Sequence, residues 1–204
     1  MDVFKLTKSK TREKILRLFF SDIEKKYYLR ELERILDIPV GNVRRELLNL
    51  EKSGLFKREK MGKQVYYSVN KQSPIFEEFK RIVSKTIGVE GILRKELQKV
   101  KNINVAFIFG SYAKEKEDSF SDIDLMIIGK PDEDELISKI SSVEKKLNRE
   151  INYSIFSSED FKRGLRKKEV FLEEIMAGPK LFIIGNQNEL EKIVGRRKSS
   201  KKEN

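Results

Sequence analysis

Hydrophobic residues in the first 72 positions recur with the spacing of amphipathic helices, and strand-like segments follow them. The helical spacing predicts three helices, at about 11–20, 28–36 and 40–52. Pro39 divides the second helix from the third, because proline disfavours helix at the residue before it and suits the first turn of a new one. Gly54 is placed to end the third helix in a left-handed conformation. Residues 55–59 and 64–69 then have the composition of two strands that form a hairpin around 60–63.

A fourth helix is predicted over residues 73–87. Its stripe of Phe76, Phe79, Val83 and Ile87 is typical of an ordinary core helix. The same aromatic stripe, directly after the hairpin, also suits a dimer contact, which a palindromic DNA site would require. Gly88 is expected to end this helix and to mark a domain boundary.

Strands and helices alternate in the second half of the chain. It opens with a helix that carries Leu93, Leu97 and Val100. Four apolar segments are predicted to be strands, at 105–109, 123–128, 151–156 and 181–184. Two amphipathic helices are predicted between them, at 133–147 and 159–176. Such alternation indicates an α/β or α+β domain with a covered sheet.

Composition narrows the possible chemistry. The 204 residues include no cysteine and no histidine, which excludes disulfides, thiolate metal sites and the commonest general base. Any catalysis would therefore use carboxylates, amines, hydroxyls and oxygen-ligated cations such as magnesium. Because the apolar runs are short and the first residues have no signal-peptide pattern, we expect a soluble, cytoplasmic protein with no membrane partner.

The net charge of +11 is unevenly distributed. Residues 1–87 carry a net charge of +9, residues 88–195 a net charge of −2, and residues 196–204 a net charge of +4. A basic first half suggests a part that meets nucleic acid, although a generally lysine-rich, solubilising composition would produce the same imbalance. The last nine residues are predicted to be a disordered basic tail.

The N-terminal pattern resembles the winged helix-turn-helix domain of bacterial and archaeal transcriptional regulators. Three segments carry the resemblance, residues 28–32, 44–55 and 62–67. It implies a recognition helix at about 40–52 in the major groove of double-stranded DNA. Its implied DNA contacts are Asn42, Arg44 and Arg45 on that helix and Lys57, Arg58, Lys60 and Lys63 on the wing. Winged helices also serve as protein-interaction or dimerisation modules, with such charges merely solvated.

The candidate chemistry of the second half lies between its first two predicted strands. Gly110 and Ser111 follow a buried strand at the apparent start of a helix, where backbone N–H groups and the helix dipole can bind phosphate. Asp122 and Asp124 lie one residue apart on the next strand, so both carboxylates face the same way and can hold a divalent cation. Lys114 and Lys116 could also contact phosphate.

These residues resemble the Gly-Ser and Asp-x-Asp motif of the DNA polymerase β-like nucleotidyltransferase superfamily, including minimal members fused to a winged helix. The resemblance implies that Gly110 and Ser111 bind a nucleoside triphosphate and that the catalytic Asp122 and Asp124 bind magnesium. Active members usually carry a third carboxylate on a later strand. Asn152 stands at that apparent position, and an amide cannot act as a base. Glu150, two residues earlier, is a possible substitute.

The sequence therefore predicts an α+β protein with four parts. They are a winged helix-turn-helix domain (1–72), a linker or dimer helix (73–88), a nucleotidyltransferase-fold domain with a small mixed sheet (89–195) and the tail (196–204). The favoured hypothesis is a homodimeric transcriptional regulator that binds DNA and magnesium-nucleotide. The alternatives are an active transferase that modifies a hydroxyl of a protein or small molecule, and an interaction module of a toxin–antitoxin-like complex.

Overall fold

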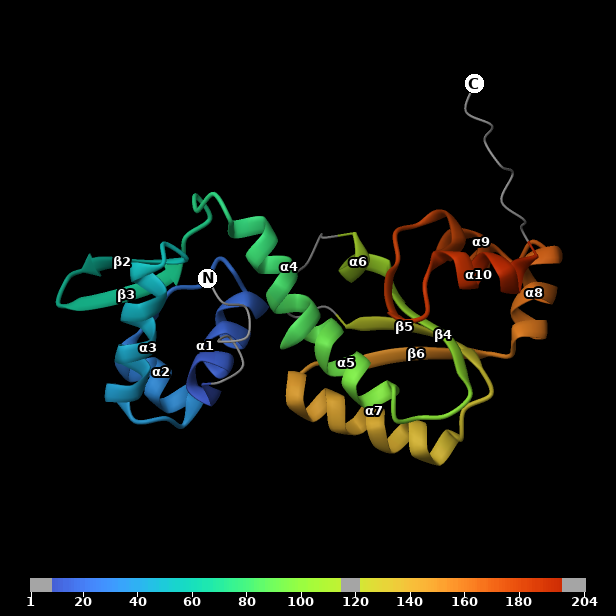
Figure 1. The fold of residues 1–204 in the computed structure, drawn as a ribbon, viewed down its shortest axis with the longest axis horizontal. Coiled ribbons are helices and arrows are strands. Elements are labelled where there is room, and N and C mark those ends of the chain that lie inside the picture. Colours follow the sequence, from blue (N-terminus) through green and yellow to red (C-terminus); the bar gives the residue numbers. More distant parts are fainter. Residues whose placement is uncertain (1–8, 115–121, 196–204) are drawn as a thin grey trace, which may run out of the picture. The chain divides into compact units, whose positions relative to one another are not determined.

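The chain divides into two compact units, residues 1–91 and 92–204 (Figure 1). The structure is a computed structural model that describes residues 9–114 and 122–195, so the predicted tail at 196–204 lies outside the described residues. No helix in the described part of the chain is long and apolar enough to cross a membrane.

The first unit contains helices and a small antiparallel sheet. Its helices are α1 (Lys10–Ser21), α2 (Leu29–Leu36), α3 (Val40–Lys52) and α4 (Phe76–Thr86), followed by the start of α5 (Val89–Leu97). Its strands are β1 (Tyr27–Tyr28), β2 (Phe56–Met61) and β3 (Gln64–Val69), in the order β1-β3-β2. The hairpin between β2 and β3 turns at Gly62, whose φ of +61° favours glycine. Only the two-residue β1 was not expected from the sequence, because it is too short to have a period.

One hydrophobic core holds the first unit together. The apolar faces of α1, α2 and α3 meet in it, with Phe19 fully buried between Tyr27 and Phe56 in edge-to-face contacts. The stripe on α4 belongs to the same core, since Phe76, Phe79, Val83 and Ile87 are all buried there. This stripe, a candidate dimer contact in the sequence, is thus covered within its own unit. The unit also extends past Gly88, where the Glu90 carboxylate accepts a hydrogen bond of 2.8 Å from Ser84.

The second unit is built on a four-stranded mixed sheet. Its strands are β4 (Ile103–Phe109), β5 (Ile123–Gly129), β6 (Ile151–Phe156) and β7 (Leu181–Ile184), in the order β6-β5-β4-β7. Only β5 and β6 are parallel, and the helix α7 (Glu133–Leu147) connects them. Asp132 caps α7 by accepting a hydrogen bond from the Glu135 N–H, and acidic residues fill the first turn and lysines the last.

Helices cover both faces of this sheet (Figure 1). On one face, Phe107 and Met126 pack against α8 (Ser158–Arg166), α9 (Val170–Ala177) and α10 (Gln187–Val194). Side chains alternate along a strand, so Ile108 and Leu125 point to the other face, on the side of α5 and α7. There the buried Glu96 of α5 pairs with Lys146 of α7 and with Lys99, which lowers the pKa of that carboxyl to about 2.

The helix predicted over 159–176 is wrong, because the chain breaks into α8 and α9. Lys168 has a φ of +57°, and the Glu169 N–H bonds to the carbonyl of Gly164, which closes α8 in a left-handed turn. A Cβ on Gly164 would lie 2.6 Å from Leu172, so the glycine lets α9 pack closely onto α8. The amphipathic period continues across the break, so the sequence pattern predicts one continuous helix and gives no sign of the turn.

Candidate functional site

Asp122 and Asp124 lie at the beginning of the central strand β5. Asp124 is the second residue of the strand, and Asp122 directly precedes it. Since side chains alternate along a strand, the two carboxylates share one face of the sheet, the face that α8, α9 and α10 cover farther along. Asp122 is exposed and Asp124 is half-buried. The structure thus brings the two predicted acidic residues together at the N-terminal end of an inner strand, where Asp122 is accessible to solvent.

Gly110 lies against the carboxylate of Asp124. Phe109, the last residue of β4, pairs with Asp124 across the antiparallel ladder, and Gly110 then turns the chain with a φ of +73°. A Cβ at position 110 would lie 2.3 Å from Oδ2 of Asp124. Any side chain at this position would therefore displace the carboxylate. Two features of this position favour glycine, namely the left-handed backbone conformation and the close approach of the Asp124 carboxylate.

The helix expected after Gly110 is only one turn long. It is α6 (Gly110–Ala113), and Ser111 is its second residue, half-buried. Four residues give almost no macrodipole, so anion binding here would depend on the backbone N–H groups of the first turn and on the Ser111 hydroxyl. Lys114 is exposed at the end of α6, and Lys116 lies outside the described residues.

The two carboxylates repel each other. Burial raises the pKa of Asp124 above its ordinary value, and the negative charge of Asp122 raises it further. Both effects penalise the ionised form of Asp124. A cation between the two carboxylates would remove that penalty, so the electrostatics of this pair fit an ion-binding role.

Asn152 occupies the place beside this pair on the neighbouring strand. It lies opposite Asp124 in the parallel register of β5 and β6, and its Nδ2 donates a hydrogen bond of 3.2 Å to Oδ2 of Asp122. The Asn152 side chain is therefore a hydrogen-bond donor to Asp122, and it adds no negative charge to the site. Glu150 is exposed, and in the described part of the chain no three acidic residues are grouped as a metal site would require.

The donor set nevertheless suits magnesium that arrives with a nucleotide. Magnesium is commonly bound by one or two protein carboxylates, with phosphate oxygens and water completing its shell. Asp122 and Asp124 are the residues that would hold it. Such an ion, when bound, supplies positive charge that offsets the charge of both carboxylates and of the phosphates.

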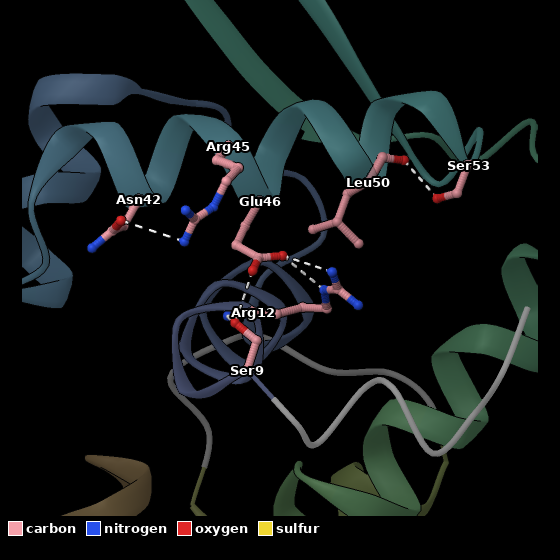
Figure 2. Close-up of polar contacts among 7 residues, drawn as sticks. All are labelled: Ser9, Arg12, Asn42, Arg45, Glu46, Leu50 and Ser53. Carbon is pink, nitrogen blue, oxygen red and sulfur yellow. Dashed lines mark hydrogen bonds and ion pairs between the residues drawn. The ribbon is translucent and has the colours of Figure 1, made fainter.

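A second candidate surface lies on the outer side of α3 in the first unit. A shallow groove of about 410 Å³ is lined by Gly41, Arg44, Arg45, Leu48, Asn49 and Lys52. Arg44 and Arg45 are exposed, and the guanidinium of Arg45 donates a hydrogen bond of 3.5 Å to the half-buried Asn42 (Figure 2). The structure thus gathers the helix residues that the sequence singled out on one face.

The predicted wing residues are all exposed on the β2–β3 hairpin. Lys57, Arg58 and Lys60 lie on β2, and Lys63 lies at the turn. Arg58 differs from the lysines because its Nε is 2.9 Å from a carboxylate oxygen of Glu51 on α3. Part of its charge is therefore already balanced within the unit.

The inner side of α3 carries a buried acid, Glu46, whose role no sequence motif indicates. Its carboxylate accepts a hydrogen bond of 2.8 Å from Ser9 and lies 2.8 Å from the Arg12 guanidinium (Figure 2). Ser9 also caps α1 by accepting from the Arg12 N–H. Glu46 follows Val43 by three residues, so helical spacing already placed it on the inward side. It fixes α3 against the start of α1.

The family model described as "Polymerase beta, Nucleotidyltransferase" matches residues 92–188. A search of curated proteins found no match. Among solved structures, the chain is similar to a toxin–antitoxin complex with AMP-PNP, with 17% identity and a TM-score of 0.39. It is similar to a toxin–antitoxin complex MntA–HpeT carrying two Asp-to-Glu substitutions, with 15% identity and a TM-score of 0.39.

A third similar structure is the tri-AMPylated HEPN toxin of Shewanella oneidensis in complex with MNT antitoxin, with 16% identity and a TM-score of 0.34. Each of the three likenesses covers 52% of this chain and 82% of the other. The family match spans the mixed sheet, the Gly110 turn and both aspartates. Residues 92–188 therefore form a polymerase β-type nucleotidyltransferase domain.

Proposed function

We propose that the nucleotidyltransferase-type domain binds a nucleoside triphosphate together with magnesium. The observation that carries this proposal is the close approach of the Gly110 turn, at the start of α6, to the carboxylate of Asp124. The N–H groups suit phosphate oxygens, and the carboxylates suit the cation that accompanies them.

The proposal leads to a cation-dependent binding prediction. We expect the protein to bind ATP by calorimetry in magnesium and not in EDTA, because the carboxylates repel phosphate unless a cation lies between them. Asp122→Ala should weaken this binding at least about tenfold, the effect of losing one interaction with a charged group. Asp134→Ala, an exposed aspartate of α7, is the matched control and should bind as the wild type does. Equal affinity with and without magnesium would contradict the proposal.

Asn152 favours nucleotide binding over efficient transfer, and changing it tests that inference. Asn152→Asp adds a third carboxylate beside Asp122 and Asp124, so we expect magnesium alone to bind on the order of tenfold more tightly, equivalent to about 1.4 kcal/mol. Transfer of label from ATP to the protein or to a partner protein should rise from the wild-type level, because a carboxylate can accept a proton. Fast transfer by the wild type would instead support the active-transferase alternative.

We also propose that the first unit is a winged helix-turn-helix domain that binds double-stranded DNA and makes the protein a nucleotide-responsive regulator. The order of its elements, with a two-stranded hairpin after α3, supports this proposal. The groove on α3, with two exposed arginines and an asparagine on its rim, supports it further. Arginine suits guanine and phosphate, and asparagine suits adenine.

Gel retardation with the DNA upstream of the protein's own gene tests this second function. Arg44→Ala and Arg45→Ala should each weaken binding at least about fivefold, the effect of losing a base or phosphate contact. Arg81→Ala, an exposed arginine on α4, is the matched control and should retain wild-type retardation. Retardation by both α3 variants equal to that of the wild type would contradict the DNA-binding proposal.

A further inference from the structure

One large aromatic side chain remains exposed on the helices that cover the second sheet. Phe171, near the start of α9, is 47% exposed, whereas its neighbours Leu172 and Ile175 are buried in the core. Exposure of a phenylalanine forfeits the free energy that its burial would contribute. The apolar residue before it in the chain, Val170, is 69% exposed.

Phe171 contacts Phe109, which lies next to the candidate nucleotide site. The two rings are in edge-to-face contact, with centroids 6.0 Å apart and planes at 80°. Phe109 directly precedes Gly110 and lies opposite Asp124 in the ladder of β4 and β5. Directly opposed residues project to the same face of a sheet, so the aromatic pair and the carboxylate share that face.

The break between α8 and α9 produces this arrangement. The left-handed turn at Lys168 ends α8 just before Phe171, and Gly164 lets α9 pack closely onto α8. Phe109 is partly buried against the core and contacts the ring of Phe171, about half of which is exposed to solvent. The result is a supported aromatic surface beside the end of β4.

We propose that Phe171, held by Phe109, stacks on the nucleobase of the bound nucleoside triphosphate. This inference rests on the proposed nucleotide site, since the phosphates would lie at the Gly110 turn and the base would extend from them over the same face of the sheet. An aromatic ring stacks on any base, because every base has a π-face. The surface therefore contributes affinity for the nucleoside and discriminates little among the bases.

The experiment compares ATP with inorganic tripolyphosphate, both in magnesium and both measured by calorimetry on the full chain. Phe171→Ala should weaken ATP binding about fivefold or more and leave tripolyphosphate binding unchanged, because only ATP has a base to stack. Phe171→Leu should show the same selective loss, since it keeps apolar bulk and removes the ring. Val170→Ala, the more exposed neighbour, is the matched control and should bind both ligands as the wild type does.

Phe171→Trp provides an independent reading. The chain contains no tryptophan, so this variant has a single indole at the proposed stacking position. ATP should quench its fluorescence, and tripolyphosphate should not. Wild-type binding of both ligands together with unchanged ATP affinity in Phe171→Ala would overturn the stacking inference and leave the phosphate site intact. Failure of the wild type to bind either ligand would overturn the proposed nucleotide function and the stacking inference with it.

Discussion

Replacing Gly110 with alanine is expected to weaken magnesium-dependent nucleotide binding strongly while leaving the protein folded. The new Cβ would lie 2.3 Å from Oδ2 of Asp124, so the carboxylate must move out of its place. A misplacement of about 1 Å in a polar constellation can cost a factor on the order of 100, and we expect a loss of that size in ATP affinity by calorimetry. The positive φ of 73° adds about 1–2 kcal/mol of backbone strain.

Gly195→Ala separates the displacement of Asp124 from the backbone strain. Gly195 ends α10 with a φ of +80°, so alanine there meets the same left-handed penalty. Its nearest neighbours would be the flexible end of Lys162, at 3.5 Å and 3.6 Å, which is ordinary contact. This variant should bind ATP as the wild type does, with a lowered melting temperature comparable to that of Gly110→Ala. Wild-type affinity in Gly110→Ala would disprove the role assigned to the close approach.

Replacing Glu46 with alanine is expected to destabilise the first unit by about 2–3 kcal/mol. The change removes the carboxylate that Ser9 and Arg12 contact in a partly buried site, and it opens a small space between α1 and α3 (Figure 2). Hydrogen exchange by mass spectrometry on the full chain resolves the effect, because peptides from 40–52 should lose protection while peptides from 123–129 should not. Retardation of DNA should weaken in parallel, since α3 loses its support.

Glu51→Ala is the matched control, with the same substitution on the same helix. Its partner Arg58 is 56% exposed at the side chain, and exposed ion pairs contribute about 0–1 kcal/mol. Exchange of the 40–52 peptides in this variant should therefore remain close to that of the wild type. An equal loss of protection in the two variants would show that Glu46 stabilises α3 no more than a surface charge does.

Much of the fold could be predicted because the elements are locally encoded. Each of the four predicted strands of the second unit is found, and α7 has the predicted bounds of 133–147, with a capping aspartate before it and a left-handed asparagine after it. Alternation and helical spacing depend only on residues a few positions apart, so a single sequence displays them. The turn between α8 and α9 could not be predicted because it depends on the close packing of Gly164 against Leu172, which the apolar period of neither helix indicates.

The candidate site was likewise predictable from the sequence in part only. The spacing of Gly110, Ser111, Asp122 and Asp124 in the sequence indicates a nucleotidyltransferase-type site. The place of Asn152 along its strand predicts that it stands where active members have a third carboxylate. In the structure, the parallel register of β5 and β6 brings Asn152 beside Asp122. The position of Glu150 relative to the aspartates could not be predicted from the sequence, because it depends on how the first residues of β5 and β6 pair.

The sequence by itself determined which chemical groups this protein can use, since the absence of histidine and cysteine and the spacing of two aspartates require no folded chain. Only the tertiary structure decided that Asp124 lies against Gly110, that Asn152 donates to Asp122 and that Phe171 reaches Phe109. These contacts join residues 14 to 62 positions apart in the chain. Strand pairing and helix packing bring such residues together, and no local period specifies them.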